Sequence, residues 1–262
     1  QLIYTKIKDI NFMHTCKLIS FLYYGYICYN RLQRILNMSY FFRYEPDGVH
    51  NIPILMIRIL FVAILLFAYS QKNNKKLLWI SLLLGLALQF TLFLWYFGNS
   101  TIFTKEGLPL YHCRLSAIML AVTYLLKKEK LMRYFSWLGL LGATIAFSFP
   151  DPSPFLWPHI TNITYIFSHM LLGLSSVIIL TKEETTLSYK DIFLYTILMN
   201  LAISFVNHYL RALPKMFPFD FTPIQLFFIL SVLISVIIFV TEKTYLYIYR
   251  LNHKNVEEDI II

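Results

Sequence analysis

The chain has 262 residues, of which 58% are hydrophobic and only 14% charged, and its mean hydropathy is positive. This composition excludes an ordinary soluble domain of the same length, which would carry more charge and fewer apolar runs. The formal net charge of +9 would point to nucleic acid in a soluble protein. Here the Lys and Arg residues lie in short loops between apolar runs, where they set membrane topology, so we expect no nucleic-acid partner.

Residues 1–37 are a short, Tyr-rich stretch interrupted by Lys17. This stretch is too weakly apolar to predict a membrane span, and it lacks the cleavage pattern of a signal peptide. We therefore expect residues 1–37 to be a poorly defined N-terminal extension or interfacial segment. The membrane domain is predicted to cover residues 38–252, followed by a cytoplasmic tail at 253–262.

Apolar stretches of bilayer length recur along the rest of the chain. Lipid tolerates only helices and closed barrels, so these stretches predict an all-α membrane bundle of about seven transmembrane helices. The predicted spans cover residues 52–70, 76–97, 109–126, 132–149, 160–181, 189–211 and 223–248.

The loops after the first, third and fifth predicted spans, together with the C-terminal tail, contain most of the Lys and Arg residues that flank the spans. Loops enriched in these residues face the cytoplasm in most multi-pass proteins. The sequence therefore predicts that the N-terminus lies outside and the C-terminus in the cytoplasm.

In this topology, four histidines from different segments fall in the outer half of the bundle. An ionisable side chain inside a span is a functional candidate, because exposure to hydrocarbon is costly. Asn200 and Asn207 lie on one polar stripe of the sixth predicted span, and Gln89 lies on a polar face of the second. We therefore expect a site that opens toward the outer leaflet. The four histidines are His112, His159, His169 and His208.

Several motifs resemble those of the YwaF-like bacterial membrane proteins, which belong with the eukaryotic transmembrane protein 164 family. The resemblance extends from Met38 to about residue 250, and its sharpest parts are the Leu-Pro-Leu-x-x-Cys box at 108–113 and the Ser-His pair at 168–169. Many bacterial relatives have His at the position of Tyr111. In this chain the histidine stands one position later, at His112. The resemblance implies a multi-pass protein of a bacterial cell membrane.

The resemblance also implies an activity, since the eukaryotic relatives are understood as cysteine-dependent phospholipid acyltransferases. Carried over by position, the nucleophile is Cys113 and its partner is His169. Arg114 and the positive end of the third span favour the thiolate form of Cys113. Asn200 or Asn207 is expected to donate to an oxyanion or to orient His169. Membrane phospholipids would be acyl donor and acceptor, with water as an alternative acceptor and no cofactor.

Two other functions remain open at this stage. The clustered histidines are compatible with a zinc-dependent lipid hydrolase, although no HxxxH or HExxH pair lies on one helix and we expect no Asp or Glu in the membrane interior. A non-catalytic lipid or solute transporter component is the other alternative. It has no support from an internal repeat or from a pair of broken helices.

Overall fold

A computed structural model describes residues 38–108, 110–182, 185–210 and 222–260, with side chains described as far as residue 251. This part of the chain is helical and contains no strand. Residues 1–37, predicted as an extension, lie outside it. The helices are α2 (Met38–Phe41), α3 (Ile54–Ser70), α4 (Lys75–Phe97), α5 (Ser100–Ile102), the π-helical turn η1 (Phe103–Gly107), α6 (His112–Leu125), α7 (Glu129–Ser148), α8 (Ile160–Leu180), α9 (Tyr189–Tyr209) and α10 (Pro223–Ile260).

Four of these helices are long and apolar enough to cross a membrane: α4, α8, α9 and the Pro223–Leu251 part of α10. The pair formed by Ser100–Gly107 and His112–Leu125, bent by 79°, would make a fifth. Each of the seven predicted ranges contains a helix of 14 residues or more. The membrane-protein prediction is therefore supported, whereas the number seven stays a prediction.

Helix α10 continues without interruption to Ile260 and so runs into the predicted tail at 253–262, whose cytoplasmic location stays a prediction.

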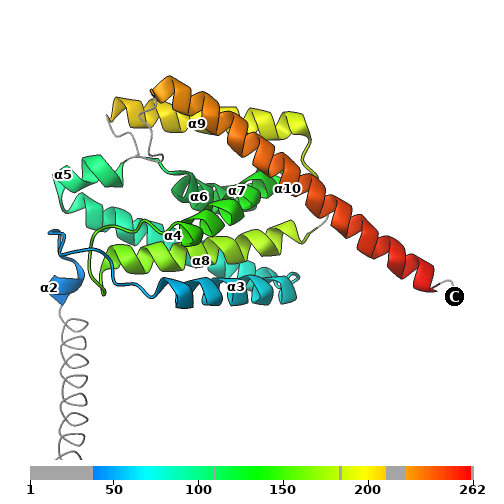
Figure 1. Ribbon diagram of the computed structural model, residues 1–262, viewed down its shortest axis with the longest axis horizontal. Helices are drawn as coiled ribbons and strands as arrows, with labels where there is room; N and C mark the ends of the chain where they lie inside the picture. The colour runs from blue at the N-terminus through cyan, green and yellow to red at the C-terminus, as the bar shows by residue number, and fades with distance from the viewer. Residues whose placement is uncertain (1–37, 109, 183–184, 211–221, 261–262) are drawn as a thin grey trace, which may run out of the picture.

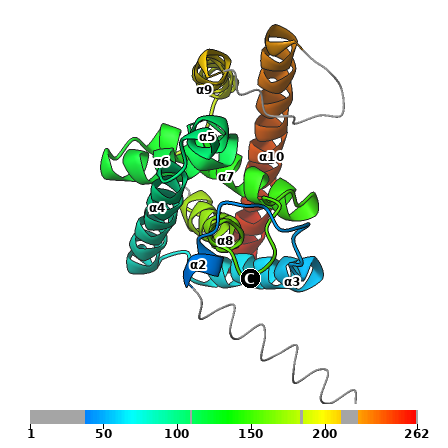
Figure 2. The same ribbon diagram turned by 90° about the vertical axis from the view of Figure 1, so that its left-hand side faces the viewer.

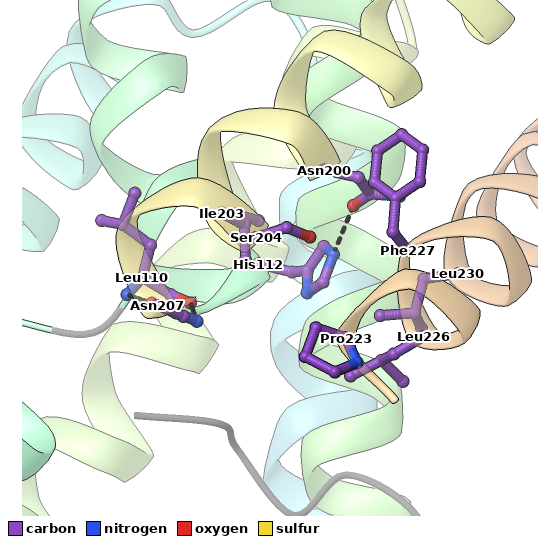
Figure 3. A pocket seen from close by; sticks show the side chains of 10 residues that line it. All are labelled: Leu110, His112, Asn200, Ile203, Ser204, Asn207, Pro223, Leu226, Phe227 and Leu230. Carbon is purple, nitrogen blue, oxygen red and sulfur yellow. Dashed lines mark hydrogen bonds between the residues drawn. The ribbon is translucent and has the colours of Figure 1, made fainter. Parts of the chain in front are cut away.

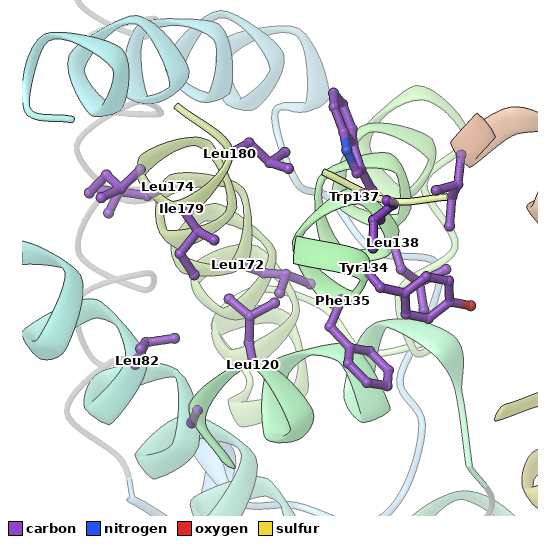
Figure 4. Close-up of a cluster of buried hydrophobic side chains, with 14 of the residues drawn as sticks. Leu82, Leu120, Tyr134, Phe135, Trp137, Leu138, Leu172, Leu174, Ile179 and Leu180 are labelled. Atoms are coloured by element: carbon purple, nitrogen blue, oxygen red, sulfur yellow. The ribbon is translucent and has the colours of Figure 1, made fainter. Parts of the chain in front are cut away.

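Helix α8 lies at the centre of the bundle, with α3, α4, α6 and α7 around it (Figure 2). Helices α9 and α10 pack on each other along one side (Figure 1). The main hydrophobic cluster joins α4, α6, α7 and α8, and Figure 4 shows Leu120, Leu172 and Phe135 within it. Two-thirds of the apolar window of α8 is buried, against only 11% for α10. The central helix is thus enclosed by protein, while the described part of the chain covers little of α10.

The chain before α3 fastens the loop between α7 and α8. Arg43 Nη2 donates to the carboxylate of Asp47 at 2.7 Å and to the carbonyl oxygen of Leu156 at 2.8 Å. Asp47 in turn accepts a hydrogen bond from the backbone N–H of Leu156. Trp95 Nε1 donates to the carbonyl oxygen of Phe42 at 2.9 Å. These bonds hold α2, the end of α4 and the α7–α8 loop together at one end of the bundle.

His159 is the N-cap of α8 and is completely buried. Its Nε2 donates to the carbonyl oxygen of Arg43 at 2.9 Å, which leaves Nδ1 to accept from the hydroxyl and the backbone N–H of Thr161. The imidazole also stacks on Phe155, with ring centroids 3.8 Å apart. Burial lowers the pKa of His159 to about 4, and protonation would remove the acceptor at Nδ1.

Acidification should therefore destabilise the fold through His159. The unfolded chain binds this proton near pH 6.5 and the folded chain only near pH 4, so the stabilisation is complete above about pH 6.5 and is lost as pH falls toward 4. The limit of the effect is about 3 kcal/mol. His159→Asn keeps an N-cap acceptor and should flatten this part of the stability profile, measured by thermal unfolding between about pH 4.5 and about pH 7.5. Parallel profiles for the two proteins would contradict the prediction.

Candidate functional site

Cys113 is the second residue of α6, and its thiol lies directly against α7. Its Sγ is 2.8 Å from the position that a Cβ on Gly142 would occupy. Only glycine at this point of α7 leaves the thiol room to approach the helix backbone so closely. Cys113 is half-buried and packs against the main hydrophobic cluster. It is the one cysteine in the described part of the chain.

His169 lies midway along α8 and contacts α7 through its ring. The imidazole centroid is 5.8 Å from the ring of Phe147 on α7 and 4.8 Å from the ring of Tyr165, one turn earlier on α8. Its Nδ1 lies 2.6 Å from the carbonyl oxygen of Tyr165. Because a carbonyl oxygen only accepts, Nδ1 carries the proton in this bond, and Nε2 is then the basic nitrogen.

Two contacts set the register of α7 against α8, which follow one another in the chain and run antiparallel. A side-chain carbon of Leu172 lies 2.7 Å from the position that a Cβ on Gly139 would occupy. Further along, the hydroxyl of Tyr165 donates to the carbonyl oxygen of Ala146 at 2.5 Å. The two contact points are seven residues apart on α7 and seven residues apart on α8. Between them, each residue of α7 therefore has a residue of α8 at the same level.

By this register, residue 169 of α8 is level with residue 142 of α7. Gly142 lies between the two contact points on α7, and His169 lies at the matching place between them on α8. The Sγ of Cys113 rests on Gly142, and the His169 ring faces Phe147, so both side chains lie against α7 at points five residues apart. Within the described residues no hydrogen bond joins them.

A second group of the predicted residues lies between α6, α9 and α10, around a cavity of about 30 Å³ (Figure 3). His112 Nε2 and Asn200 Oδ1 are 2.9 Å apart, and Asn200 Nδ2 donates to Ser231 Oγ at 2.9 Å. Asn207 holds the backbone of Leu110 by two bonds, accepting from its N–H at 2.7 Å and donating to its carbonyl oxygen at 2.9 Å. Both asparagine side chains are thus used to fasten α9 to its neighbours.

The prediction of one shared cavity therefore needs correction. Cys113 and His169 face α7, whereas His112, Asn200 and Asn207 line the small cavity at α9 and α10. Consecutive residues of a helix point about 100° apart, so His112 and Cys113 face different neighbours. Each amide of Asn200 and Asn207 is bonded through its oxygen and one N–H, and both line the other cavity, so the expected oxyanion role beside Cys113 has no support from their placement.

Gln89 and Arg114 line a separate, mainly apolar cavity of about 310 Å³ between α4, η1 and α6. Arg114 Nη1 donates to the carbonyl oxygens of Glu106 at 3.2 Å and Gly107 at 2.7 Å. These bonds satisfy carbonyl groups at the end of η1. The Arg114 guanidinium therefore stabilises the bend between η1 and α6.

The remaining histidines stand apart from this region. His159 is the N-cap of α8, with both ring nitrogens engaged, and His208 is exposed on α9. No three His, Cys, Asp or Glu side chains in the described part of the chain lie close enough together to hold a metal ion. The predicted histidine cluster therefore does not form among these residues.

A buried ion pair was missed by the sequence analysis, which expected no acidic side chain in the membrane interior. Glu242 of α10 is completely buried and accepts from Arg133 Nε at 2.9 and 3.0 Å. It also accepts from Trp137 Nε1 at 2.6 Å and from the backbone N–H of Leu187 at 3.0 Å. The sequence signal was a single Glu at the end of a long apolar run, a position that a charge occupies only when it has partners.

Comparison with known proteins gives the family. The model of the TMEM164 family matches residues 48–241, which include α3 to α9, most of the apolar part of α10, and both Cys113 and His169. No match was found among curated proteins or among solved structures. The match covers well over half of the chain, and the helices described above are long and apolar enough to cross a membrane. The chain is therefore a multi-pass membrane protein that belongs to the TMEM164 family.

Proposed function

We propose that this protein moves fatty acyl chains on phospholipids, with Cys113 as the nucleophile and His169 as its base. Two contacts with one helix support the proposal: the Cys113 Sγ lies against Gly142 of α7, and the His169 ring faces Phe147 of α7. A thiol with an imidazole as its base is the minimal pair for covalent acyl transfer. Apo geometry is commonly looser than the catalytic hydrogen bond.

The tautomer of His169 supports the same assignment. Its Nδ1–H is bound by the carbonyl oxygen of Tyr165, which orients the ring and leaves the Nε2 lone pair to take a proton. In catalytic triads a carboxylate plays this orienting role toward the histidine. Here a backbone carbonyl takes that part, which suits a site inside an apolar bundle.

The start of α6 supplies the electrostatics that an acyl-transfer site requires. Its N-cap, Tyr111, makes no side-chain capping bond, so N–H groups of the first turn have no acceptor within the helix. These groups and the positive end of the helix dipole favour negative charge near Cys113. They are the donors that we assign to the oxyanion, in place of the asparagines.

The chemistry then proceeds in two balanced steps. His169 takes the thiol proton while the sulfur attacks the acyl carbonyl, and the ester bond breaks to release a lysophospholipid whose oxygen receives that proton. The acyl group is now a thioester on Cys113. In the second step His169 takes a proton from the hydroxyl of an acceptor lysophospholipid or from water, and the new ester or free fatty acid forms as the thiol is restored.

Cys113→Ala should abolish acyl transfer, and His169→Ala should lower its rate by about 10² to 10⁴-fold, the range of a lost general base. The measurement is transfer of a deuterated acyl chain between phospholipids in proteoliposomes, with mass-spectrometric detection of a hydroxylamine-sensitive acyl group on Cys113. Matched controls are His208→Ala, which alters an exposed histidine, and the double variant Cys16→Ala, Cys28→Ala. All controls should keep the native rate. A Cys113→Ala protein that transfers acyl chains at the native rate would rule out the covalent mechanism.

A further inference from the structure

The largest cavity described here, of about 580 Å³, lies at the other end of α6 from Cys113. Side chains from α4, α6, α7, α8 and the segment after α8 line it. Cationic groups border it, and aromatic rings and aliphatic side chains form the rest of its wall. We call it the basic cavity, and the residues that matter for its chemistry are Lys75, Trp79, Tyr124, Lys127, Arg133 and Lys182.

The described residues leave the basic cavity with unbalanced positive charge. Of its four cationic side chains, only Arg133 has a carboxylate partner there, namely Glu242. Glu129 also lines the cavity, and it accepts a hydrogen bond from the hydroxyl of Thr185 at 2.7 Å. Three lysines against one glutamate make this a site for an anion.

Arg133 adds an independent sign of a missing anion. Its side chain is 3% exposed, and its Nε and Nη1 are occupied by Glu242 and by the carbonyl oxygens of Leu180 and Lys182. Its Nη2 is buried and has no hydrogen-bond partner within the described residues. A buried guanidinium N–H without an acceptor is costly. Arg133 is one of the residues that line the cavity, so a small turn of its side chain would let a ligand oxygen accept from Nη2.

Lys127 gives a third observation. Its φ is 52°, in the left-handed region that favours glycine. It ends α6 in a Schellman arrangement, in which Lys128 N–H donates to the carbonyl oxygen of Thr123 at 2.9 Å. Glycine would be the less strained residue at this position. The chain instead carries a lysine there, at the border of the basic cavity.

From these observations we propose that the basic cavity binds the phosphate group of an anionic glycerophospholipid. Lysine ammonium groups and the free Arg133 N–H would hold the phosphate oxygens. Trp79 and Tyr124 are the residue types that lie at the headgroup level of a bilayer, and the apolar wall suits the upper part of the acyl chains. The loop charges predict that this end faces the cytoplasm, whose leaflet is rich in anionic lipid. This site is separate from the acyl chemistry at Cys113.

The test uses the purified full chain in detergent, titrated with phosphatidylglycerol or with phosphatidylcholine of the same acyl chains and followed by native mass spectrometry. The test variant replaces the three cavity lysines by Gln. The control variant replaces, by Gln, three nearby lysines that do not line the cavity: Lys76, Lys128 and Lys190. A separate single variant, Lys127→Gly, removes one charge and relieves the left-handed backbone.

The native chain and the control should prefer phosphatidylglycerol, and the test variant should bind it about tenfold or more weakly, since one lost hydrogen bond to a charged group costs roughly tenfold. Lys127→Gly should also bind it more weakly while melting no lower than the native chain. Equal phosphatidylglycerol binding by test and control variants would overturn the site. Displacement of the lipid by millimolar inorganic phosphate would overturn the lipid as its ligand. Cys113→Ala should bind phosphatidylglycerol normally, so failure of the acyl-transfer proposal leaves this result unchanged.

Discussion

Glu242→Ala is expected to destabilise the protein by about 3–5 kcal/mol, the cost of removing one partner from a buried ion pair. The reason is that the Arg133 guanidinium would stay in the apolar interior without its carboxylate. Trp137 Nε1 and the backbone N–H of Leu187 would lose their acceptor at the same time. The measurement is chemical unfolding of the detergent-purified protein, followed by tryptophan fluorescence.

Two further variants separate the ion pair from the packing around it. Glu242→Gln keeps the size and an acceptor oxygen but removes the charge, so it should lose less stability than Glu242→Ala. Replacing both Arg133 and Glu242 by Met removes both charges, and it should recover much of the loss, because a buried pair exchanged for apolar groups is often nearly neutral. If Glu242→Ala unfolded at the same denaturant concentration as the native chain, the buried pair would not be what anchors α10.

Gly142→Ala is expected to lower acyl transfer by about 10²-fold, the effect of misplacing a reacting group by about 1 Å. The added Cβ would lie 2.8 Å from the Cys113 Sγ, which is too close, so the thiol must move. Because the clash involves the end of a flexible side chain, the fold should survive. Alanine also favours the helix over glycine by about 1 kcal/mol. The measurement pairs the transfer rate with the melting temperature.

The matched control is Gly85→Ala on α4, where nothing lies within 4 Å of the added Cβ. It carries the same change in helix propensity without a steric conflict, so the transfer rate should stay native. An unchanged rate in Gly142→Ala would contradict the placement of the reactive thiol on α7. This prediction rests on the proposed acyl-transfer function, whereas the expected loss in Glu242→Ala does not.

Helix positions were largely predictable from the sequence, because apolar runs of bilayer length admit few structures other than helices. The predicted span 160–181 agrees closely with α8 (Ile160–Leu180), and 76–97 agrees closely with α4 (Lys75–Phe97). The polar stripe on the sixth span also correctly placed Asn200 and Asn207 on a buried face. Local pattern was sufficient for these features because each depends on a single helix.

Features that depend on two helices were not predictable in this way. Asn200 meets His112, and Glu242 meets Arg133 more than a hundred positions away. Spacing along one helix indicates which face is buried, but it carries no information on which neighbour that face meets. The choice of α7 as the common neighbour of Cys113 and His169 depends in the same way on a glycine whose importance appears only once the helices are packed.

The position of Glu242 couples this protein to bilayer thickness. The uncharged run of α10 before it covers residues 223–241 and is about 28 Å long, close to the hydrocarbon core of a bilayer at about 30 Å. Glu242 fastens α10 to α7 at the end of this run. A membrane thinner or thicker than the run would therefore change the tilt of α10 about this anchor, and with it the contacts that α10 makes with α9.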